Sequence, residues 1–420
     1  MKVFSFIKQS SAAKFIITDI LNAFNRHGNE IMFIDFDLAV KKYKNSDPKL
    51  KYNKIAELIV SIKEYNPDIV LSYGIEIFSH IFEEIDKNLQ ITLYDYLKHK
   101  PVICFLFDFG QPFDENTDEI KCLELFQSHN VFFFVWDKQA IKIMNKCGVT
   151  NTGYFPMAVN EKIFSEDMSV SRDKTICFVG GPTPERIETL ETISSCNPDI
   201  YGYGKEEWMK SSLLKKNYKY PVFAQNDLCK LYSQYKFSVN ITRPHGFTSL
   251  NMRVYESIIC GSIMITDDKA DVYDLFIPDK EILIYKSRNE LKSIIEKYLP
   301  DSGKLKEIKN NGISRILESH TYLKRISEIN GTLSSLIFET ELFNKLFVLY
   351  SNQDWENISS LINCTNPDRI KINKIYFLLF KVLTEKNKQV QDESVIKNCI
   401  EEIQKVTLKN KRINRMISNA

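Results

Sequence analysis

The sequence of 420 residues lacks several features that would each have indicated a particular class of protein. Its longest apolar runs, at residues 102–107 and 131–136, are far shorter than the roughly 20 residues that a membrane-spanning helix needs. Lysine and arginine number 56 against 54 aspartate and glutamate, so the net charge of +2 provides no bulk attraction for nucleic acid. We therefore expect a soluble globular protein whose partners do not include nucleic acid.

The sequence has no paired cysteine spacing, and we expect no signal peptide at its start. Of the 9 cysteines, Cys104, Cys177 and Cys260 lie in or beside apolar runs, which favours buried reduced thiols over disulfides or a zinc site. The first eleven residues lack the long apolar region of a signal peptide and predict a strand instead. Both observations fit a protein of the reducing cytoplasm.

What the sequence does contain is a regular alternation of strand and helix patterns. Strands are predicted at residues 2–7, 30–37, 68–74, 101–110 and 130–137, and helices at residues 14–26 and 55–64. Such near-continuous apolar strands are typical of a parallel sheet that helices cover on both faces. Gly28 and Gly148 stand where helix C-terminal caps are expected.

The alternation breaks at residues 151–164, which include Gly153 and Pro156, and starts again at residue 174. Further strands are predicted at residues 199–204, 236–241, 262–268 and 281–285, and only helical patterns follow residue 321. We predict two doubly wound α/β domains, 1–160 and 161–325, and a helical extension, 326–420. Ligands of such sheets bind at the carboxyl ends of the strands, here between the domains.

The glycine-rich turn in FVGGPTPERIETL, residues 178–190, is a candidate anion site. Gly180 and Gly181 end a predicted strand, and Arg186 lies in the first turns of the following helix. Backbone N–H groups and the helix dipole favour an anion there, and the guanidinium of Arg186 matches a phosphate. A tight connection with a surface arginine is the alternative. The turn is neither GxGxxG nor a P-loop, so it supports neither a dehydrogenase nor an NTPase.

A second candidate site follows the strand at residues 236–241. Its loop is rich in imidazole and hydroxyl groups, namely His245, Thr248 and Ser249. Asn251 then begins an apolar helix that carries Arg253 and Glu256. These two charges either pair within the helix or hold a nucleotide diphosphate. In the second case Glu256 accepts hydrogen bonds from ribose hydroxyls, while Arg253 and the first amides of the helix face phosphate.

Residues 240–268, 274–291 and 319–326 resemble the C-terminal half of CgeB-like glycosyltransferases of the spore-maturation type. The shared pattern is Asn-x-Arg-Val-[Phe/Tyr]-Glu, a Cys-Gly pair, a Thr-Asp strand end, a Glu-Ile strand and a His-Thr-Tyr helix. The Pro-Glu-Arg turn at residues 184–186 is similar to the same family. The resemblance covers roughly residues 174–325, and the N-terminal half only in its general layout.

This resemblance implies a GT-B fold, with two facing Rossmann-like domains that hold a nucleotide sugar mainly in the second and an acceptor mainly in the first. It also implies roles for matched positions: ribose for Glu256, diphosphate for Arg253 and Arg186, and the region of the base for Tyr203 and Gly204. Related retaining enzymes carry a glutamate eight residues before the one matched by Glu256, where this chain has Thr248.

Two residues are candidates for acid–base chemistry. Asp108 follows a predicted strand and would remove the proton of an acceptor hydroxyl, although a turn carboxylate fits the same pattern. His245 is more plausible as a phosphate or sugar contact than as a base. Asp35 and Asp37 imitate a metal-binding Asp-x-Asp motif, but strand alternation alone places them on one face. We expect no metal, because arginines and helix dipoles serve the diphosphate.

We therefore predict a metal-independent, cofactor-free glycosyltransferase that uses a UDP- or GDP-type nucleotide sugar. The predicted acceptor is a surface polysaccharide, a lipid-linked glycan or a protein. Two alternatives stay open. One is a non-catalytic protein that binds a nucleotide sugar or carbohydrate, which the departure at Thr248 and the helical tail leave possible, and the other is a GT-B epimerase or phosphorylase. The basic residues 408–420 are either a solvated helix face or a contact to anionic lipid at the inner membrane face.

Overall fold

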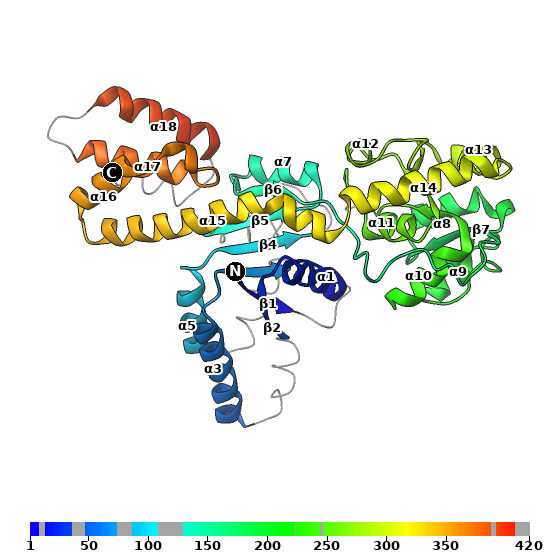
Figure 1. Cartoon of the computed structure of the whole chain (residues 1–420), viewed down its shortest axis with the longest axis horizontal. Coiled ribbons are helices and arrows are strands. Elements are labelled where there is room, and N and C mark those ends of the chain that lie inside the picture. The colour runs from blue at the N-terminus through cyan, green and yellow to red at the C-terminus, as the bar shows by residue number, and fades with distance from the viewer. Residues whose placement is uncertain are drawn as a thin grey trace. The chain divides into compact units, whose positions relative to one another are not determined.

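The structure, a computed structural model, describes residues 1–7, 13–35, 47–73, 86–107, 129–222, 224–243, 247–387 and 392–407. The chain divides into two compact units (Figure 1). One comprises Met1–Phe155 and Ile326–Ala420, and the other comprises Pro156–Arg325. The C-terminal helices therefore group with the N-terminal sheet.

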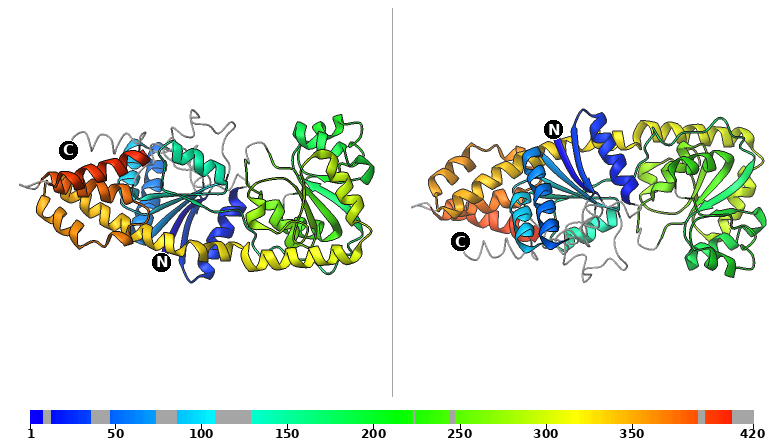
Figure 2. Two further views of the ribbon diagram at one scale, coloured as in Figure 1. Left: turned by 90° about the horizontal axis from the view of Figure 1, so that it is seen from above. Right: turned by 90° about the horizontal axis from the view of Figure 1, so that it is seen from below.

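The first unit contains a six-stranded sheet in the order β2-β1-β3-β4-β5-β6, in which every neighbouring pair is parallel. Its strands are β1 (Lys2–Ile7), β2 (Glu30–Asp35), β3 (Ile69–Tyr73), β4 (Val102–Leu106), β5 (Val131–Val135) and β6 (Thr152–Tyr154). All residues of the interior strands β4 and β5 are buried, and helices lie on both faces of the sheet (Figure 2). The predicted parallel sheet is confirmed.

The edge strand β6 corrects the sequence analysis, which takes this segment only as a break in the pattern. Gly153 allows β6 to pair with β5, because a Cβ there would lie 3.0 Å from the ring of Phe132 and 3.1 Å from that of Phe134. A strand of three residues is too short for a periodic pattern to reveal.

The helices of the first unit come from both ends of the chain. They are α1 (Ala13–Arg26), α3 (Pro48–Tyr65), α5 (Lys87–Leu97), α7 (Lys138–Lys146), most of α15 (Tyr322–Ser351), α16 (Trp355–Cys364), α17 (Lys374–Lys386) and α18 (Glu393–Thr407). The buried carboxylate of Glu339 joins α15 to the start of α17 by accepting the backbone N–H of Ile372 at 3.0 Å and of Asn373 at 2.6 Å. Asn373 donates in turn to the carbonyl of His129 at 2.8 Å, which ties these helices to the start of β5.

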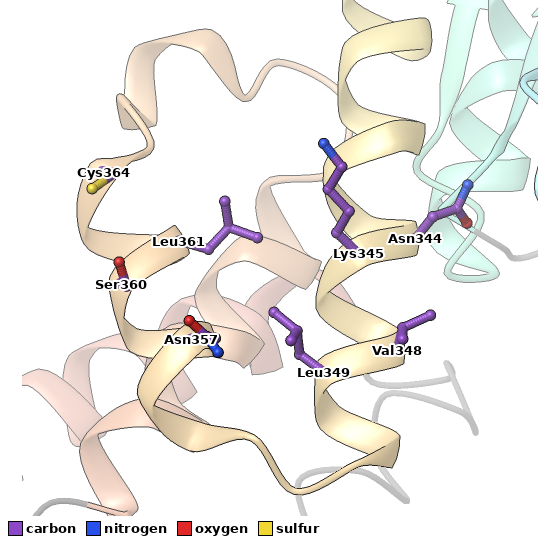
Figure 3. A pocket seen from close by; sticks show the side chains of 8 residues that line it. All are labelled: Asn344, Lys345, Val348, Leu349, Asn357, Ser360, Leu361 and Cys364. Atoms are coloured by element: carbon purple, nitrogen blue, oxygen red, sulfur yellow. The ribbon is translucent and has the colours of Figure 1, made fainter.

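A mostly apolar surface hollow of about 680 Å³ lies between α15 and α16 (Figure 3). Its lining residues are Asn344, Lys345, Val348, Leu349, Asn357, Ser360, Leu361 and Cys364. Among the residues that the structure describes, no helix has the length and hydropathy needed to cross a membrane. The basic segment 408–420 lies outside those residues.

The second unit contains a five-stranded parallel sheet in the order β11-β10-β9-β7-β8. Its strands are β7 (Lys174–Val179), β8 (Asp199–Tyr201), β9 (Tyr235–Asn240), β10 (Ile263–Asp267) and β11 (Leu283–Tyr285). Its helices are α8 (Pro184–Glu191), α9 (Lys205–Lys210), α10 (Gln225–Gln234), α11 (Met252–Ile259), α12 (Val272–Leu275), α13 (Arg288–Tyr298) and α14 (Ser302–Ser319). The strand order reverses between β7 and β9, and doubly wound sheets bind ligands at the carboxyl ends of the strands at such a point.

Candidate functional site

Two glycine-rich turns meet at the carboxyl ends of β7 and β8. A Cβ at Gly202 would lie 2.2 Å from the carbonyl oxygen of Gly180, and a Cβ at Gly181 would lie 2.3 Å from the ring of Tyr203. Gly204 has a φ of +77°, which disfavours any side chain. Since neither close approach leaves room for a Cβ, the glycines let the two turns pack together. The structure thus brings together Gly180, Gly181, Tyr203 and Gly204, all of which the sequence analysis singles out.

Tyr203 presents its ring at this edge of the sheet with 50% of the residue exposed. Its hydroxyl accepts a hydrogen bond from Nη2 of Arg243, which follows β9. An exposed aromatic ring beside a guanidinium is suited to stacking on a nucleobase. The sequence analysis missed Arg243, and the only local signal is its position directly after a predicted strand.

Arg186 is buried, with 4% of the residue exposed, so the alternative of a surface arginine is wrong. It donates to the carbonyl of Ile241 from Nε at 3.0 Å and from Nη2 at 2.9 Å, and to the carbonyl of Gly181 from Nη1 at 2.9 Å. These bonds join the chain after β7 to the chain after β9, across the point where the strand order reverses. They use three of the five guanidinium N–H groups, and a phosphate contact by the other two stays a prediction.

The electrostatics of this edge are dominated by arginines. Burial and the neighbouring charges of Arg253 and Arg243 lower the pKa of Arg186 to about 10, against the opposing influence of Tyr203 and Asp267. Arg186 therefore keeps its charge at neutral pH, within range of the charges of two further guanidinium groups. An anion placed among them would relieve their repulsion.

The N-terminus of α11 points its amides at the same edge. Asn251 caps the helix, since its Oδ1 accepts the backbone N–H of Arg253 at 3.0 Å. Its Nδ2 donates at 2.6 Å to Oδ1 of Asn240, the last residue of β9. The cap therefore fixes the start of α11 against the end of β9, where the helix dipole adds to the positive potential of the arginines.

Glu256 lies one turn further along α11 and is only 5% exposed. Burial raises the pKa of the nearby Tyr232, and the charge of Glu256 raises it further. A carboxylate this buried must be balanced by hydrogen bonds or by a positive charge. Both expectations for Glu256, a pair with Arg253 and a ribose contact, are compatible with this position.

The loop before α11 is fixed in part by a backbone hydrogen bond. The carbonyl of Thr248 accepts the N–H of Asp271 at 2.9 Å, and Ser249 is 1% exposed. Asp267, which ends β10, accepts hydrogen bonds from the N–H of Thr242 at 3.2 Å and from its hydroxyl at 2.9 Å. These contacts set the spacing of the β9 and β10 ends that frame the site.

Several predicted residues lie outside the described residues. Asp108, His245 and Asp37 are among them, and so are the segments that directly follow β1 and β3. The acid–base roles of Asp108 and His245 therefore stay predictions. Within the described part of the chain, no group of three or more His, Cys, Asp or Glu side chains could hold a metal ion.

Residues 185–331 match the model of a family described as Glycosyl transferase-like. This segment begins in α8 and contains all candidate residues of the second unit except the glycines of the first turn. No curated protein sequence matches the chain significantly.

Solved structures resemble the chain over most of its length. HepE of Anabaena in complex with UDP-glucose has a TM-score of 0.59 at 12% identity and covers 80% of this chain and 100% of its own. Sucrose-phosphate synthase of Thermosynechococcus elongatus has a TM-score of 0.57 at 12% identity, with coverages of 80% and 99%. A glycosyltransferase of Rickettsia africae has a TM-score of 0.55 at 11% identity, with coverages of 80% and 98%. The fold is therefore GT-B, as predicted.

Proposed function

We propose that this protein is a glycosyltransferase that binds a nucleoside diphosphate sugar at the carboxyl ends of β7, β8 and β9. The observation that carries the proposal is the set of three guanidinium groups near the strand ends: Arg186 on the carbonyls of Gly181 and Ile241, Arg243 on Tyr203, and Arg253 in the first turn of α11, whose cap is bonded to the end of β9. Such a set, with the first amides of the helix, suits a diphosphate. The Glycosyl transferase-like match at residues 185–331 supports it, and so does the similarity in fold to HepE, whose structure contains UDP-glucose.

Each part of the donor has a proposed partner. The base stacks on Tyr203 beside Arg243, and the ribose hydroxyls donate to Glu256. The diphosphate faces Arg253 and the first amides of α11, while Arg186 positions the strand ends by its bonds to Gly181 and Ile241. This set of partners is able to hold a diphosphate without a metal ion, which is part of the proposal.

In the proposed reaction the main task of the protein is to stabilise the charge of the leaving diphosphate, and no covalent intermediate with a protein side chain is needed. As an acceptor oxygen attacks C1 of the sugar, the bond from C1 to the phosphate oxygen breaks and the diphosphate gains negative charge. Guanidinium groups and helix amides that are already in place stabilise that charge in the transition state. Asp108 is the proposed base for the acceptor proton.

We propose that the acceptor belongs to a surface polysaccharide, a lipid-linked glycan or a protein. We also propose that this protein is a CgeB-like enzyme of the cytoplasm. In this proposal the basic segment 408–420 contacts anionic lipid at the inner membrane face. Binding to anionic vesicles, lost on deletion of this segment, would test the membrane contact.

Calorimetric titration with UDP, GDP and their glucose conjugates tests the donor site. We expect the variant Glu256→Ala to bind the preferred nucleotide about 10- to 100-fold more weakly, since hydrogen bonds to a charged group contribute roughly 1.5–3 kcal/mol. The matched control is Glu296→Ala, because Glu296 is an exposed carboxylate on α13. Equal affinity of the Glu256 variant and the wild type would remove the ribose assignment.

A product assay separates a transferase from a non-catalytic binding protein. The wild type should release nucleoside diphosphate from the donor that it binds, slowly with water and faster with a suitable acceptor. Tight binding with no release under either condition would favour the non-catalytic alternative, and conversion of the sugar without any acceptor would favour an epimerase.

A further inference from the structure

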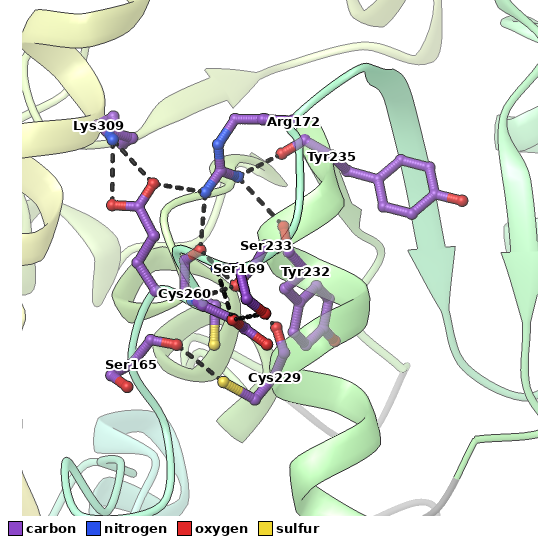
Figure 4. Close-up of polar contacts among 11 residues, drawn as sticks. Ser165, Ser169, Arg172, Cys229, Tyr232, Ser233, Tyr235, Cys260 and Lys309 are labelled. Atoms are coloured by element: carbon purple, nitrogen blue, oxygen red, sulfur yellow. Dashed lines mark hydrogen bonds and ion pairs between the residues drawn. The ribbon is translucent and has the colours of Figure 1, made fainter.

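Two cysteines, Cys229 and Cys260, lie near each other in the second unit (Figure 4). Cys229 belongs to α10 and is 9% exposed, whereas Cys260 follows the last turn of α11 and is fully buried. Both are free thiols in the structure. They are separated by 31 positions in the sequence, so no local spacing motif predicts that they form a pair.

The backbones of the two cysteines are held close by groups other than their thiols. The hydroxyl of Ser233 lies 2.9 Å from the carbonyl oxygen of Cys229 and 3.2 Å from that of Cys260, so it bridges the two segments. Arg172 donates to the same Cys260 carbonyl at 3.0 Å and to the carbonyl of Tyr235 at 2.7 Å (Figure 4).

Arg172 is itself fixed by an ion-pair network. Its Nη2 lies 2.8 Å from Oε1 of Glu166, and Lys309 contacts the same oxygen at 2.9 Å. A Cβ at Gly261 would lie 2.5 Å from this Nη2, so the turn after Cys260 is also shaped around Arg172. Arg172 and Ser233 therefore hold the backbone segments of the two cysteines near each other without using either thiol.

The environments of the two thiols differ in a way that suits oxidation. A hydrogen bond from the Cys260 thiol lowers the pKa of Cys229 to about 6, whereas burial raises the pKa of Cys260 well above its ordinary value. The carbonyl of Ser165, 2.8 Å from the Cys229 sulfur, accepts the S–H of the neutral form. Of the two thiols, Cys229 is the less buried and has the lower pKa, so in an oxidation it is the candidate nucleophile and Cys260 the candidate resolving partner.

We propose that Cys229 and Cys260 are a peroxide-sensitive pair that closes into a reversible disulfide. The Cys229 thiolate attacks hydrogen peroxide, an S–O bond forms, the O–O bond breaks, and hydroxide leaves. The Cys260 sulfur then attacks the sulfenic acid, the S–S bond forms, the S–O bond breaks, and the oxygen leaves with the Cys260 proton as water. Two electrons pass from the thiols to one peroxide. The bond would tie α10 to the end of the helix that carries Arg253 and Glu256.

The test uses the full chain, treated at pH 7 with a few equivalents of hydrogen peroxide and digested without reduction. Mass spectrometry should find the peptides of Cys229 and Cys260 linked, with a loss of two titratable thiols per chain that dithiothreitol reverses. Both thiols remaining free while the exposed Cys364 is oxidised would overturn the proposal.

Single variants identify the order of events. In Cys260→Ser the oxidised Cys229 should persist as a sulfenic acid that dimedone traps, and in Cys229→Ser the thiol of Cys260 should survive the same treatment. Cys229→Ala provides a second variant if the serine is poorly folded, with the melting temperature as the check. Trapping of a Cys260 sulfenic acid in either Cys229 variant would contradict the assignment of the nucleophile.

Discussion

The conservative substitution Arg186→Lys separates the charge of this residue from its geometry. Lysine keeps the positive charge, but its single ammonium cannot reproduce a fork that reaches the carbonyls of both Ile241 and Gly181. At least one buried carbonyl then loses its charged donor. Because such bonds contribute roughly 1.5–3 kcal/mol and an unsatisfied buried group costs about 1–3 kcal/mol, we expect a destabilisation of about 2–4 kcal/mol.

Scanning calorimetry of the full chain measures this effect. For a unit of the size of Pro156–Arg325, a loss of 2–4 kcal/mol lowers the melting temperature by roughly 5–15 °C. The control is Arg288→Lys, because the side chain of Arg288 forms an exposed ion pair with Glu188 and its replacement should change the melting temperature by no more than about 2 °C. An Arg186→Lys protein as stable as this control would refute the claim that the bonds of Arg186 to Ile241 and Gly181 hold the two strand ends together.

Three further outcomes are expected. Tyr203→Ala should weaken nucleotide binding about tenfold in calorimetry, since stacking on a base contributes roughly 1–3 kcal/mol, whereas Tyr203→Phe should keep most of the affinity. Burial and the charge of Arg325 lower the pKa of His320 to about 3, below the value near 6.5 of an unfolded histidine. Protonation therefore favours unfolding, so stability should fall as the pH drops below about 6.5, by about 2 kcal/mol at pH 5, and urea titrations of His320→Gln should show a smaller fall. Glu339→Gln should lower the urea midpoint more than a change of the exposed Glu341, because only Glu339 accepts backbone N–H groups before α17. An unchanged affinity of Tyr203→Ala would contradict stacking on Tyr203. An unchanged pH dependence in His320→Gln would contradict the lowered pKa of His320, and an unchanged urea midpoint of Glu339→Gln would contradict the role of its bonds to the backbone.

The parallel sheets could be predicted because inner strands such as β4 and β5 are buried on both faces and appear in the sequence as continuous apolar runs. The C-terminal helices were harder to delimit. The helical pattern after residue 321 does not show where one helix ends and the next begins, whereas the structure has the single helix α15 through Glu339. The reason is non-local: the carboxylate of Glu339 is satisfied by amides more than thirty residues away, a partner that no local pattern contains.

In the candidate site, too, the features set by local sequence could be predicted and those set by distant contacts could not. The glycines of both turns and the cap Asn251 could be found because turn and cap chemistry is local. Arg186 was assigned to phosphate from its position near a helix start, but its bonds to Ile241 depend on how β7 and β9 lie together. Arg243 became a candidate only once the structure placed it against Tyr203.

The central claim is that a nucleoside diphosphate binds where the strand order reverses between β7 and β9. A crystal structure of the protein with UDP and with GDP tests this most directly. We expect the diphosphate oxygens at hydrogen-bonding distance, roughly 3 Å, from the first amides of α11 and from Arg253, with the base against Tyr203 and the ribose at Glu256. A nucleotide bound at another surface of the second unit, with these residues left free, would contradict the account.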